Sequence, residues 1–521
     1  MQGDADRGMR AELEDLAPTP LSARSWNAIT FSACWIALLL NPASLSVAAS
    51  LLSLGLTFVE ACVAHTIAGL VLLLALILNA WPGVKYGIPY PVLCRASFGF
   101  HGAHFCTLTR GFVAIFWLSF QLWQASLVIA AGINRFAPGF ERWTPLGDDL
   151  SLSILLIFLA FTGVHVLAAM AGVALLKPLV NVSAVLLVAG WIGLCVWAGS
   201  LAPFSEAVGV RHPSSDALDS KAQQWLHAIN SSISTWSTLV LNVVDLSRFC
   251  KTQREQVVGQ VLGFPTTYAL TGFIGVWIAS ATLVRDGEAL WLVGDYIDDW
   301  ELWAVILGMI AVAVSALVTD IVSNMLSPIN DLLNLQPVLP TAVGRWLTYR
   351  SCAMITLGLA VAMCPWWAFA SQAVLVKILL EGYATVTGSI TGVMLTDFWL
   401  LRRAQLDVGA LYIPPTTCCP ASIARHDANQ GTPGANWKAF VAVGIPIALC
   451  APGFFANVFN ANPSTLAGRF FMYIYSSSWL FTVFTAGALY FLLNCGPRGA
   501  VTESSGSSEK KLEIKEVDHY P

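Results

Sequence analysis

Two stretches of the chain combine an apolar background with polar side chains of the kind that bind small molecules. Residues 231–251 carry Trp236, Asn242 and Asp245. Residues 318–335 carry hydroxyl, amide and carboxylate side chains, namely Thr319, Asp320, Ser323, Asn324, Ser327, Asn330 and Asp331. Because polar groups in lipid cost free energy, helices that keep them usually line a cavity or bind something. The two stretches therefore predict a pathway for a polar solute across a bilayer.

The composition indicates that membrane helices hold these residues. Hydrophobic residues make up 56% of the 521 residues, charged residues make up 11%, and the mean hydropathy is +0.68. Soluble proteins carry about 25% charged residues. The net charge of −4 gives no indication of nucleic-acid binding. The cysteines lack the spacing of a zinc site, so we expect neither a metal nor a cofactor.

Runs of roughly 20 apolar residues predict twelve membrane helices. They lie near residues 28–52, 55–80, 104–131, 151–173, 177–198, 225–247, 259–284, 301–325, 347–364, 370–398, 437–458 and 470–494. We therefore expect an all-α polytopic membrane protein. Residues 1–25 form an N-terminal tail, residues 26–496 form the transmembrane domain, and residues 497–521 form a tail whose composition predicts disorder.

The distribution of Lys and Arg predicts the orientation in the membrane. With the N-terminus in the cytoplasm, only six of the 27 basic residues fall in outer loops: Arg135, Arg142, Arg211, Lys221, Arg285 and Arg469. Lys377 falls within a helix, and the others lie on the cytoplasmic side. An even number of helices then places both termini in the cytoplasm. The plasma membrane is the default location, an organelle membrane is the alternative, and the oligomeric state stays open.

The first predicted helix contains Asn41-Pro42 near its middle. Proline removes one backbone hydrogen bond, so this sequence predicts either a kink or a true break. A broken membrane helix exposes carbonyl and amide groups that bind ions or substrates.

Six segments stand in order along nearly the whole chain. They are Asp15-Leu16-Ala17-Pro18 followed by Arg24-Ser25-Trp26, PGVKYGIPYPVLCRASFGFHGA (82–103), WLSFQLW (117–123), TWSTLVLNVVDLSRFCKTQREQVVGQ (235–260), NMLSPINDLLNL (324–335) and EGYATVTGSITGVMLTDFWLLRR (381–403). Together they resemble the nucleobase–cation symporter family, specifically its allantoin/uracil-permease-like branch. The resemblance implies a leucine-transporter-like fold of two inverted five-helix repeats plus two helices. It also implies a secondary active symporter, not an enzyme, that imports a small planar nitrogen heterocycle by alternating access.

The resemblance carries over four substrate-binding positions. Trp117 and Trp236 match aromatic residues that sandwich a flat ring, and Gln121 and Asn324 match amides that hydrogen-bond its edge. The chemistry agrees, because indoles pack against ring faces and an amide offers both a donor and an acceptor. Trp117 and Gln121 are also i, i+4 neighbours, which share one helix face.

The sequence leaves the substrate open among uracil, allantoin, purines, hydantoins, nucleosides and thiamine-like vitamins. Leu38 replaces an acidic residue that many relatives carry, and Gln124-Ala125-Ser126 is bulkier than the glycine pair found in others. A non-transporting sensor on the same fold is the other alternative. A membrane-embedded enzyme needs a cluster of His, Asp or metal ligands at one membrane face, and the sequence offers none.

The coupling ion is predicted from the eighth helix. Sodium-coupled relatives place adjacent Ser and Thr hydroxyls there, whereas this chain has Val318-Thr319 and so lacks one oxygen ligand. Asp320 follows directly and is able to carry a proton. We therefore expect coupling to protons in preference to sodium, with Glu60 as the next candidate carboxylate. His65 and His165 are interpreted as hydrogen-bonded core histidines.

Overall fold

The protein is all-α within the part that the structure describes. The computed structural model describes residues 16–495 except 147–149, 213–219, 292–293, 295–296, 369–380, 413–433 and 460–464. Over these residues the chain forms helices, with two isolated bridges as the only β-type pairing. The all-α prediction is confirmed. The predicted C-terminal tail and the first part of the N-terminal tail lie outside the described residues.

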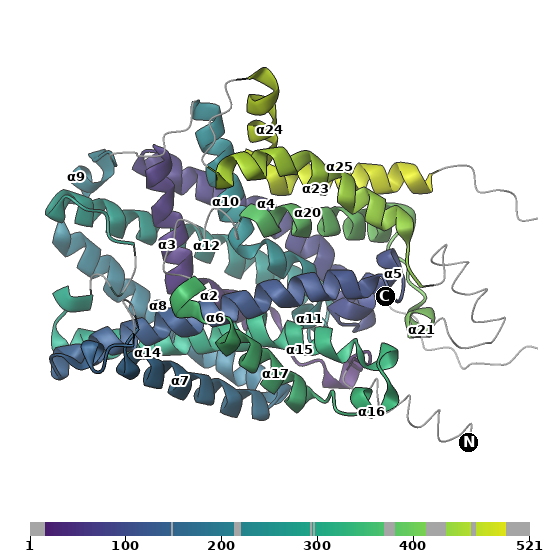
Figure 1. Ribbon diagram of the computed structural model, residues 1–521, viewed down its shortest axis with the longest axis horizontal. Coiled ribbons are helices and arrows are strands. Elements are labelled where there is room, and N and C mark those ends of the chain that lie inside the picture. Colours follow the sequence, from purple (N-terminus) through teal and green to yellow (C-terminus); the bar gives the residue numbers. More distant parts are fainter. Residues whose placement is uncertain are drawn as a thin grey trace, which may run out of the picture.

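Eight described helices are long and apolar enough to cross a membrane. They are α4 (Phe58–Tyr86), α6 (Ala103–Phe136), α7 (Leu152–Met170), α8 (Leu176–Leu201), α12 (Gln253–Asp286), the run Leu302–Val338, the run Gly382–Leu401 and α23 (Trp437–Val458). Two bent pairs raise the number to ten: α2 (Ala28–Leu39) with α3 (Pro42–Ser50), and α24 (Leu466–Ser476) with α25 (Ser478–Asn494). Figure 1 shows most of these helices roughly parallel to the long axis of the molecule.

The predicted number of twelve spans is not confirmed. The sixth predicted span forms α10 (Lys221–Asn242) and α11 (Val244–Ser247), which carry many polar residues, and the ninth forms α17 (Tyr349–Ala362), which has only 14 residues. Neither meets the length and hydropathy expected of a span. The start of the tenth, with Lys377, lies outside the described residues, and the rest forms α20 (Glu381–Leu395) and the π-helical η9 (Thr396–Leu401).

Short helices connect these elements. They are η1 (Leu21–Ala23), η2 (Leu51–Leu54), α5 (Tyr90–Phe98), η3 (Phe140–Arg142), η4 (Val173–Leu175), α9 (Phe204–Gly209), η5 (Ile297–Asp299), η7 (Gln336–Val338), α16 (Thr341–Gly344), α18 (Pro365–Ala368) and α21 (Val408–Leu411).

The first span is broken at Asn41-Pro42, and its halves are bent by 62°. Pro42 occupies the first turn of α3, where its missing N–H costs no hydrogen bond. Asn41 caps α3 by accepting a hydrogen bond from the Ser44 N–H at 2.9 Å. Its amide also donates to the Leu38 carbonyl at the end of α2, at 2.7 Å. Asn41 therefore satisfies both ends of the break, which is a true interruption rather than a kink.

Small residues bring α12 close to the broken helix. At Gly263, an added Cβ would lie 2.8 Å from the Ser32 Cα and 3.1 Å from the Trp35 Cβ on α2. Gly259, one turn earlier, faces Phe31 in the same way. Such a Gly-xxx-Gly pair allows two membrane helices to approach closely. This contact between α12 and α2 holds the first half of the broken span in place against the bundle.

The eighth predicted helix changes its winding at its centre. The α-helix α14 (Leu302–Thr319) passes into the π-helical segment η6 (Asp320–Met325) and then into α15 (Leu326–Leu333). A π-helical turn inserts extra backbone into a helix and is often found at functional sites. All six side chains of η6 are buried.

One end of the bundle is fastened by α5 and by the chain before α2. The Arg95 guanidinium, buried in α5, donates to the Leu411 carbonyl at 2.9 Å and to the Asn334 amide oxygen at 2.5 Å. Burial lowers the pKa of Arg95 to about 10, so it stays charged at neutral pH. Trp26 exchanges backbone hydrogen bonds with Phe249 and Lys251, at 2.9 and 3.1 Å. These bonds join the residues just before α2 to the residues just after α11.

Candidate functional site

A cavity lies between α3, α6, α10 and η6. The space in and at the mouth of this cavity that no atom fills is about 370 Å³, a figure that includes open solvent. Most of its lining carries hydroxyl, amide, indole or guanidinium groups: Asn41, Ala43, Ser44, Arg110, Trp117, Gln121, Thr235, Trp236, Thr238, Leu239, Thr319, Ser323 and Asn324. The four residues that the sequence assigned to substrate binding therefore meet at one cavity, although they lie on three different helices.

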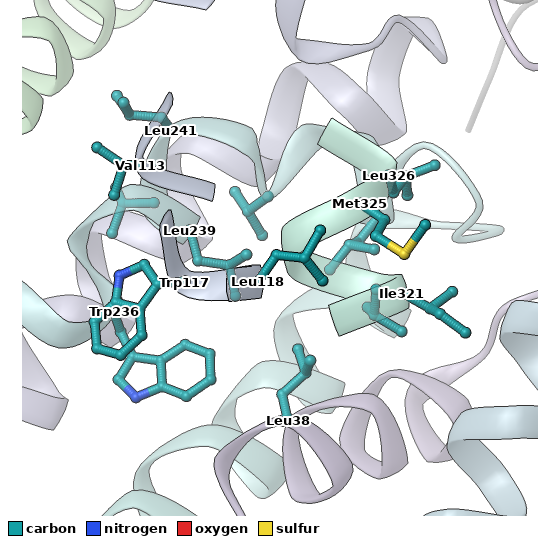
Figure 2. Close-up of a cluster of buried hydrophobic side chains, with 14 of the residues drawn as sticks. Leu38, Val113, Trp117, Leu118, Trp236, Leu239, Leu241, Ile321, Met325 and Leu326 are labelled. Carbon is teal, nitrogen blue, oxygen red and sulfur yellow. The ribbon is translucent and has the colours of Figure 1, made fainter. Parts of the chain in front are cut away.

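The two indoles form an aromatic side of this cavity. Figure 2 shows the rings of Trp117 and Trp236 next to each other, with Ile321 and Met325 of η6 on the opposite side of the cluster. The Trp117 Nε1–H donates to the Tyr383 hydroxyl at 3.2 Å, and Tyr383 donates to the Ser234 carbonyl at 2.9 Å. In the described part of the chain, the Trp236 Nε1 has no hydrogen-bond partner. Trp117 is thus held by α20, whereas packing alone holds Trp236.

The two amides differ in how they are held. The Asn324 Nδ2 donates to the Asp320 Oδ1 at 3.0 Å, which fixes the direction of the Asn324 amide. The Gln121 amide makes no hydrogen bond to the described residues. Both side chains are buried, at 8% exposure for Gln121 and 5% for Asn324. Because buried amides without partners are costly, Gln121 is poised to pair with a bound molecule.

Arg110 belongs to the cavity and was missed by the sequence analysis. It is 1% exposed, its Nε donates to the Asn242 amide oxygen at 2.8 Å, and its Nη2 donates to the Ser323 carbonyl at 2.7 Å. No partner for its Nη1 exists among the described residues. The sequence nevertheless contains an indication of this role. Arg110 lies two helical turns before Trp117, inside an apolar helix where burying a charge costs free energy.

The broken helix presents three successive carbonyls, and a hydroxyl group lies near each of them. Thr319 donates to the Leu38 carbonyl at 3.4 Å and Ser315 to the Leu40 carbonyl at 2.6 Å. The Thr271 hydroxyl oxygen lies 3.4 Å from the Leu39 carbonyl oxygen but donates its hydrogen to the Thr267 carbonyl at 2.8 Å. Thr319, predicted to take part in ion coupling, thus connects η6 to the break. Over the described residues there is no group of three or more His, Cys, Asp or Glu side chains able to hold a metal ion.

Asp320 lies behind the cavity rather than in its lining. It is fully buried, with its Oδ1 bonded to Asn324 and its Oδ2 3.1 Å from the Nε2 of His165 on α7. His165 is a hydrogen-bonded core histidine, as expected, but its partner is the candidate proton carrier. The other core histidine, His65, stacks on Tyr268 with ring centroids 4.0 Å apart.

Glu60, the second candidate carboxylate, has a local role at the start of α4. It forms a capping box with Thr57 and an ion pair of 2.7 Å with Lys221. Its side chain is 25% exposed and it is not part of the cavity lining. These contacts account for Glu60 without ion transport.

A family model for permeases of cytosine/purines, uracil, thiamine and allantoin matches residues 18–480. The chain belongs to this permease family. The permease is 28% identical over 495 residues to an allantoin permease of Bacillus subtilis. The alignment covers 93% of this chain and 93% of that one. The permease is also 29% identical over 498 residues to a purine-uracil permease of Arabidopsis thaliana, covering 92% of this chain and 77% of that one.

The solved structures establish the fold of the permease. Mhp1, a nucleobase-cation-symport-1 family transporter in a closed conformation with bromovinylhydantoin bound, superposes with a TM-score of 0.70 at 18% identity. The match covers 91% of this chain and 93% of that one. The leucine-transporter-like fold expected from the sequence is confirmed. The protein is a membrane permease and not an enzyme, since its family and relatives are permeases.

Proposed function

We propose that this permease is a secondary active symporter that imports a small planar nitrogen heterocycle together with a proton, by alternating access. The observation that carries the proposal is the convergence of Trp117, Trp236, Gln121 and Asn324 on one cavity beside a broken helix. Allantoin and purine-uracil permeases are among its relatives, which supports this substrate class.

The lining supports a ring that carries carbonyl oxygens. Indole faces grip the two faces of such a ring, and the amides of Gln121 and Asn324 pair with its alternating donors and acceptors. Arg110 adds a guanidinium with one N–H group unpaired within the described residues, and guanidinium groups are strong donors to carbonyl or anionic oxygens. A cationic ring of the thiamine type is disfavoured beside that charge. Uracil, allantoin and oxidised purines fit better, and a nucleoside remains the alternative.

Proton coupling is supported by the chemistry at the broken helix. Hard cations need several oxygen ligands. Val318 supplies no side-chain oxygen, and the carbonyls of Leu38 and Leu40 accept hydrogen bonds from the Thr319 and Ser315 hydroxyls. Asp320 is a buried carboxylate bonded to the cavity residue Asn324, which suits a proton carrier. A membrane potential of about 100 mV contributes about 2.3 kcal/mol per charge moved, enough for roughly 50-fold accumulation.

We place the permease in the plasma membrane with both termini in the cytoplasm. The basis is the excess of Lys and Arg on the side of the termini. Proteolysis of intact and permeabilised cells tests the orientation, because a cytoplasmic C-terminal tag is cleaved only after permeabilisation.

The test of function is a competition screen in a host that lacks its own heterocycle transporters. Labelled uracil, allantoin, hypoxanthine, a hydantoin, uridine and thiamine are offered singly and against one another, with and without a protonophore. We expect saturable uptake of one heterocycle that the protonophore abolishes. Binding without uptake would identify a sensor, and preference for thiamine or uridine would overturn the proposed substrate class.

A further inference from the structure

Three polar side chains form a line that runs from the cavity into the protein. Asn324 lines the cavity and donates from Nδ2 to the Asp320 Oδ1 at 3.0 Å. The Asp320 Oδ2 lies 3.1 Å from the His165 Nε2. The His165 Nδ1 lies 2.9 Å from the Phe161 carbonyl. Asp320 and His165 are both 0% exposed.

The Phe161 carbonyl determines where the protons are. A carbonyl only accepts, so the His165 Nδ1 must carry a hydrogen to form that bond. The 3.1 Å contact between Nε2 and Asp320 Oδ2 then needs one further proton between the two atoms. That proton gives either an imidazolium with a carboxylate or a neutral imidazole with a carboxylic acid, and each pair is neutral overall. Without this proton, the lone pair of the His165 Nε2 would face the buried Asp320 carboxylate, and the two would repel each other.

Among the described residues of the helices around this pair, no further charged side chain contacts Asp320 or His165. The helices that pack most closely against η6 are α6, α7, α14 and α15, and α17 also packs against α7. The charged residue of α17, Arg350, is exposed. His165 is the titratable group from α7, and α14 contains no charged residue. Arg110 of α6 donates to the Ser323 carbonyl, and Asp331 of α15 lies near Arg110 and Ser327. The proton therefore belongs to His165 and Asp320 alone.

We propose that His165 and Asp320 together hold the transported proton, and that Asn324 transmits its presence to the substrate. This inference rests on the proposed proton-coupled function. With the proton in place, Asp320 keeps its contact to His165 and orients the Asn324 amide toward the cavity. Loss of the proton breaks that contact, and the freed carboxylate draws the amide away from the substrate. His165 is thus a positioning residue that acts through Asp320 and Asn324.

The coupling must be reciprocal, because two ligands that share one equilibrium change each other's affinity by the same factor. Proton binding therefore raises substrate affinity, and substrate binding draws a proton onto the pair. The purified permease should take up about one proton for each heterocycle that it binds. Between the pKa of the pair in the free protein and its pKa in the complex, the dissociation constant should rise about tenfold per pH unit.

The experiment measures heterocycle binding to the full-length protein in nanodiscs, using the best substrate from the screen. Affinity is followed from pH 5 to pH 9, and proton uptake is followed with a pH indicator in weak buffer. The variants are His165→Gln and Asp320→Asn, which keep hydrogen-bonding groups but do not titrate. His65→Gln is the matched control, since His65 is also a buried histidine, 2% exposed, and lies on α4 away from the cavity lining.

We expect wild type and His65→Gln to take up a proton on binding. His165→Gln and Asp320→Asn should bind within about tenfold of wild type at pH 6 but take up none, and their affinity should vary less than twofold across the range. Proton uptake retained by His165→Gln overturns the inference while leaving proton symport intact. If His165→Gln does not fold, Asp320→Asn decides by the same measurement. A wild-type protein that binds the heterocycle without proton uptake overturns the proposed coupling itself.

Discussion

The Trp117 Nε1–H donates to the Tyr383 hydroxyl at 3.2 Å, and this bond fastens one aromatic wall of the cavity to α20. Tyr383 in turn donates to the Ser234 carbonyl of α10, the helix that carries Trp236. Tyr383 therefore links the Trp117 indole to the backbone of the helix that carries Trp236. Of these two tryptophans, only Trp117 donates from its ring nitrogen to a described residue, so the two should respond differently to replacement.

Replacing either indole with alanine should abolish uptake at substrate concentrations well below the wild-type dissociation constant. Stacking of an aromatic side chain on a nucleobase is worth about 1–3 kcal/mol by alanine substitution, which is a loss of roughly 5- to 150-fold in affinity. Phenylalanine keeps a π face, so it should rescue in part. Trp236→Phe should retain more uptake than Trp117→Phe, because only the latter loses a hydrogen bond.

Uptake of the labelled substrate and surface expression are measured for each of these variants. Trp303→Ala on α14 serves as the control, because Trp303 is 67% exposed on the outside of the protein. Alanine variants of Trp117 or Trp236 that reach the membrane and transport normally would exclude the aromatic clamp.

The amides should determine specificity. A site built to hydrogen-bond a substrate rejects analogues that lack the group, because buried polar atoms are then left unpaired. Gln121→Ala and Asn324→Ala should therefore weaken binding of the best substrate more than binding of poorer analogues. Inhibition constants for a series of heterocycles measure this difference. Equal losses for every ligand would indicate that the amides serve helix packing instead.

Arg110 should be required with its full guanidinium group. Lysine keeps the charge, but its three N–H donors sit on one nitrogen and cannot span the Asn242 oxygen, the Ser323 carbonyl and the substrate as the planar guanidinium does. We expect Arg110→Lys to lower affinity by at least tenfold, about 1.4 kcal/mol, and more for ligands with carbonyl groups. Arg135→Lys, at the other end of α6, is the control. Wild-type affinity in Arg110→Lys would remove Arg110 from the binding site.

Uptake should rise as the external pH falls toward about 5, because each transported heterocycle brings a proton from that side. It should not change when choline replaces sodium. Asp320→Asn should flatten the pH profile, since the amide keeps the shape but does not titrate. Initial rates of uptake across the pH range provide the measurement. Glu60→Gln is the comparison: a flattened profile in that variant, with a normal one in Asp320→Asn, would move the proton site to Glu60.

The close contact between α12 and α2 should be sensitive to one methyl group. Gly263→Ala places a Cβ 2.8 Å from the Ser32 Cα and should cost about 1–3 kcal/mol, as other overpacked cores do. Gly163→Ala on α7 meets nothing within 4 Å and should leave stability unchanged or raise it. Thermal unfolding of the purified variants compares the two. Equal melting temperatures would contradict the close packing at Gly263.

Local patterns predicted much of this architecture. The apolar runs gave most of the membrane helices, and Asn41-Pro42 marked the break because proline cannot continue the hydrogen-bond ladder. The i, i+4 spacing of Trp117 and Gln121 placed both on one helix face, and both line the cavity. These features depend on residues that are close together in the sequence, which is why they could be predicted from it.

Contacts between distant segments were not predictable in the same way. His165 and Asp320 are 155 residues apart, and nothing in either helix indicates that they meet. The π-helical winding of η6, which turns Asp320 toward α7 and Asn324 toward the cavity, leaves no clear pattern in the sequence. The predicted number of spans was also too high for the helices that are long and apolar enough to cross a membrane. Two predicted spans differ from these helices, because α10 is polar and α17 is short.

The most direct test of the account is transport by the purified protein in sealed proteoliposomes. A gradient with an acidic exterior is imposed in sodium-free buffer, and the labelled heterocycle is added outside. The account predicts accumulation above the external concentration, collapse of that accumulation on adding a protonophore, and none with Trp117→Ala. Accumulation that requires sodium, or none under any ion gradient while the heterocycle still binds, would contradict it.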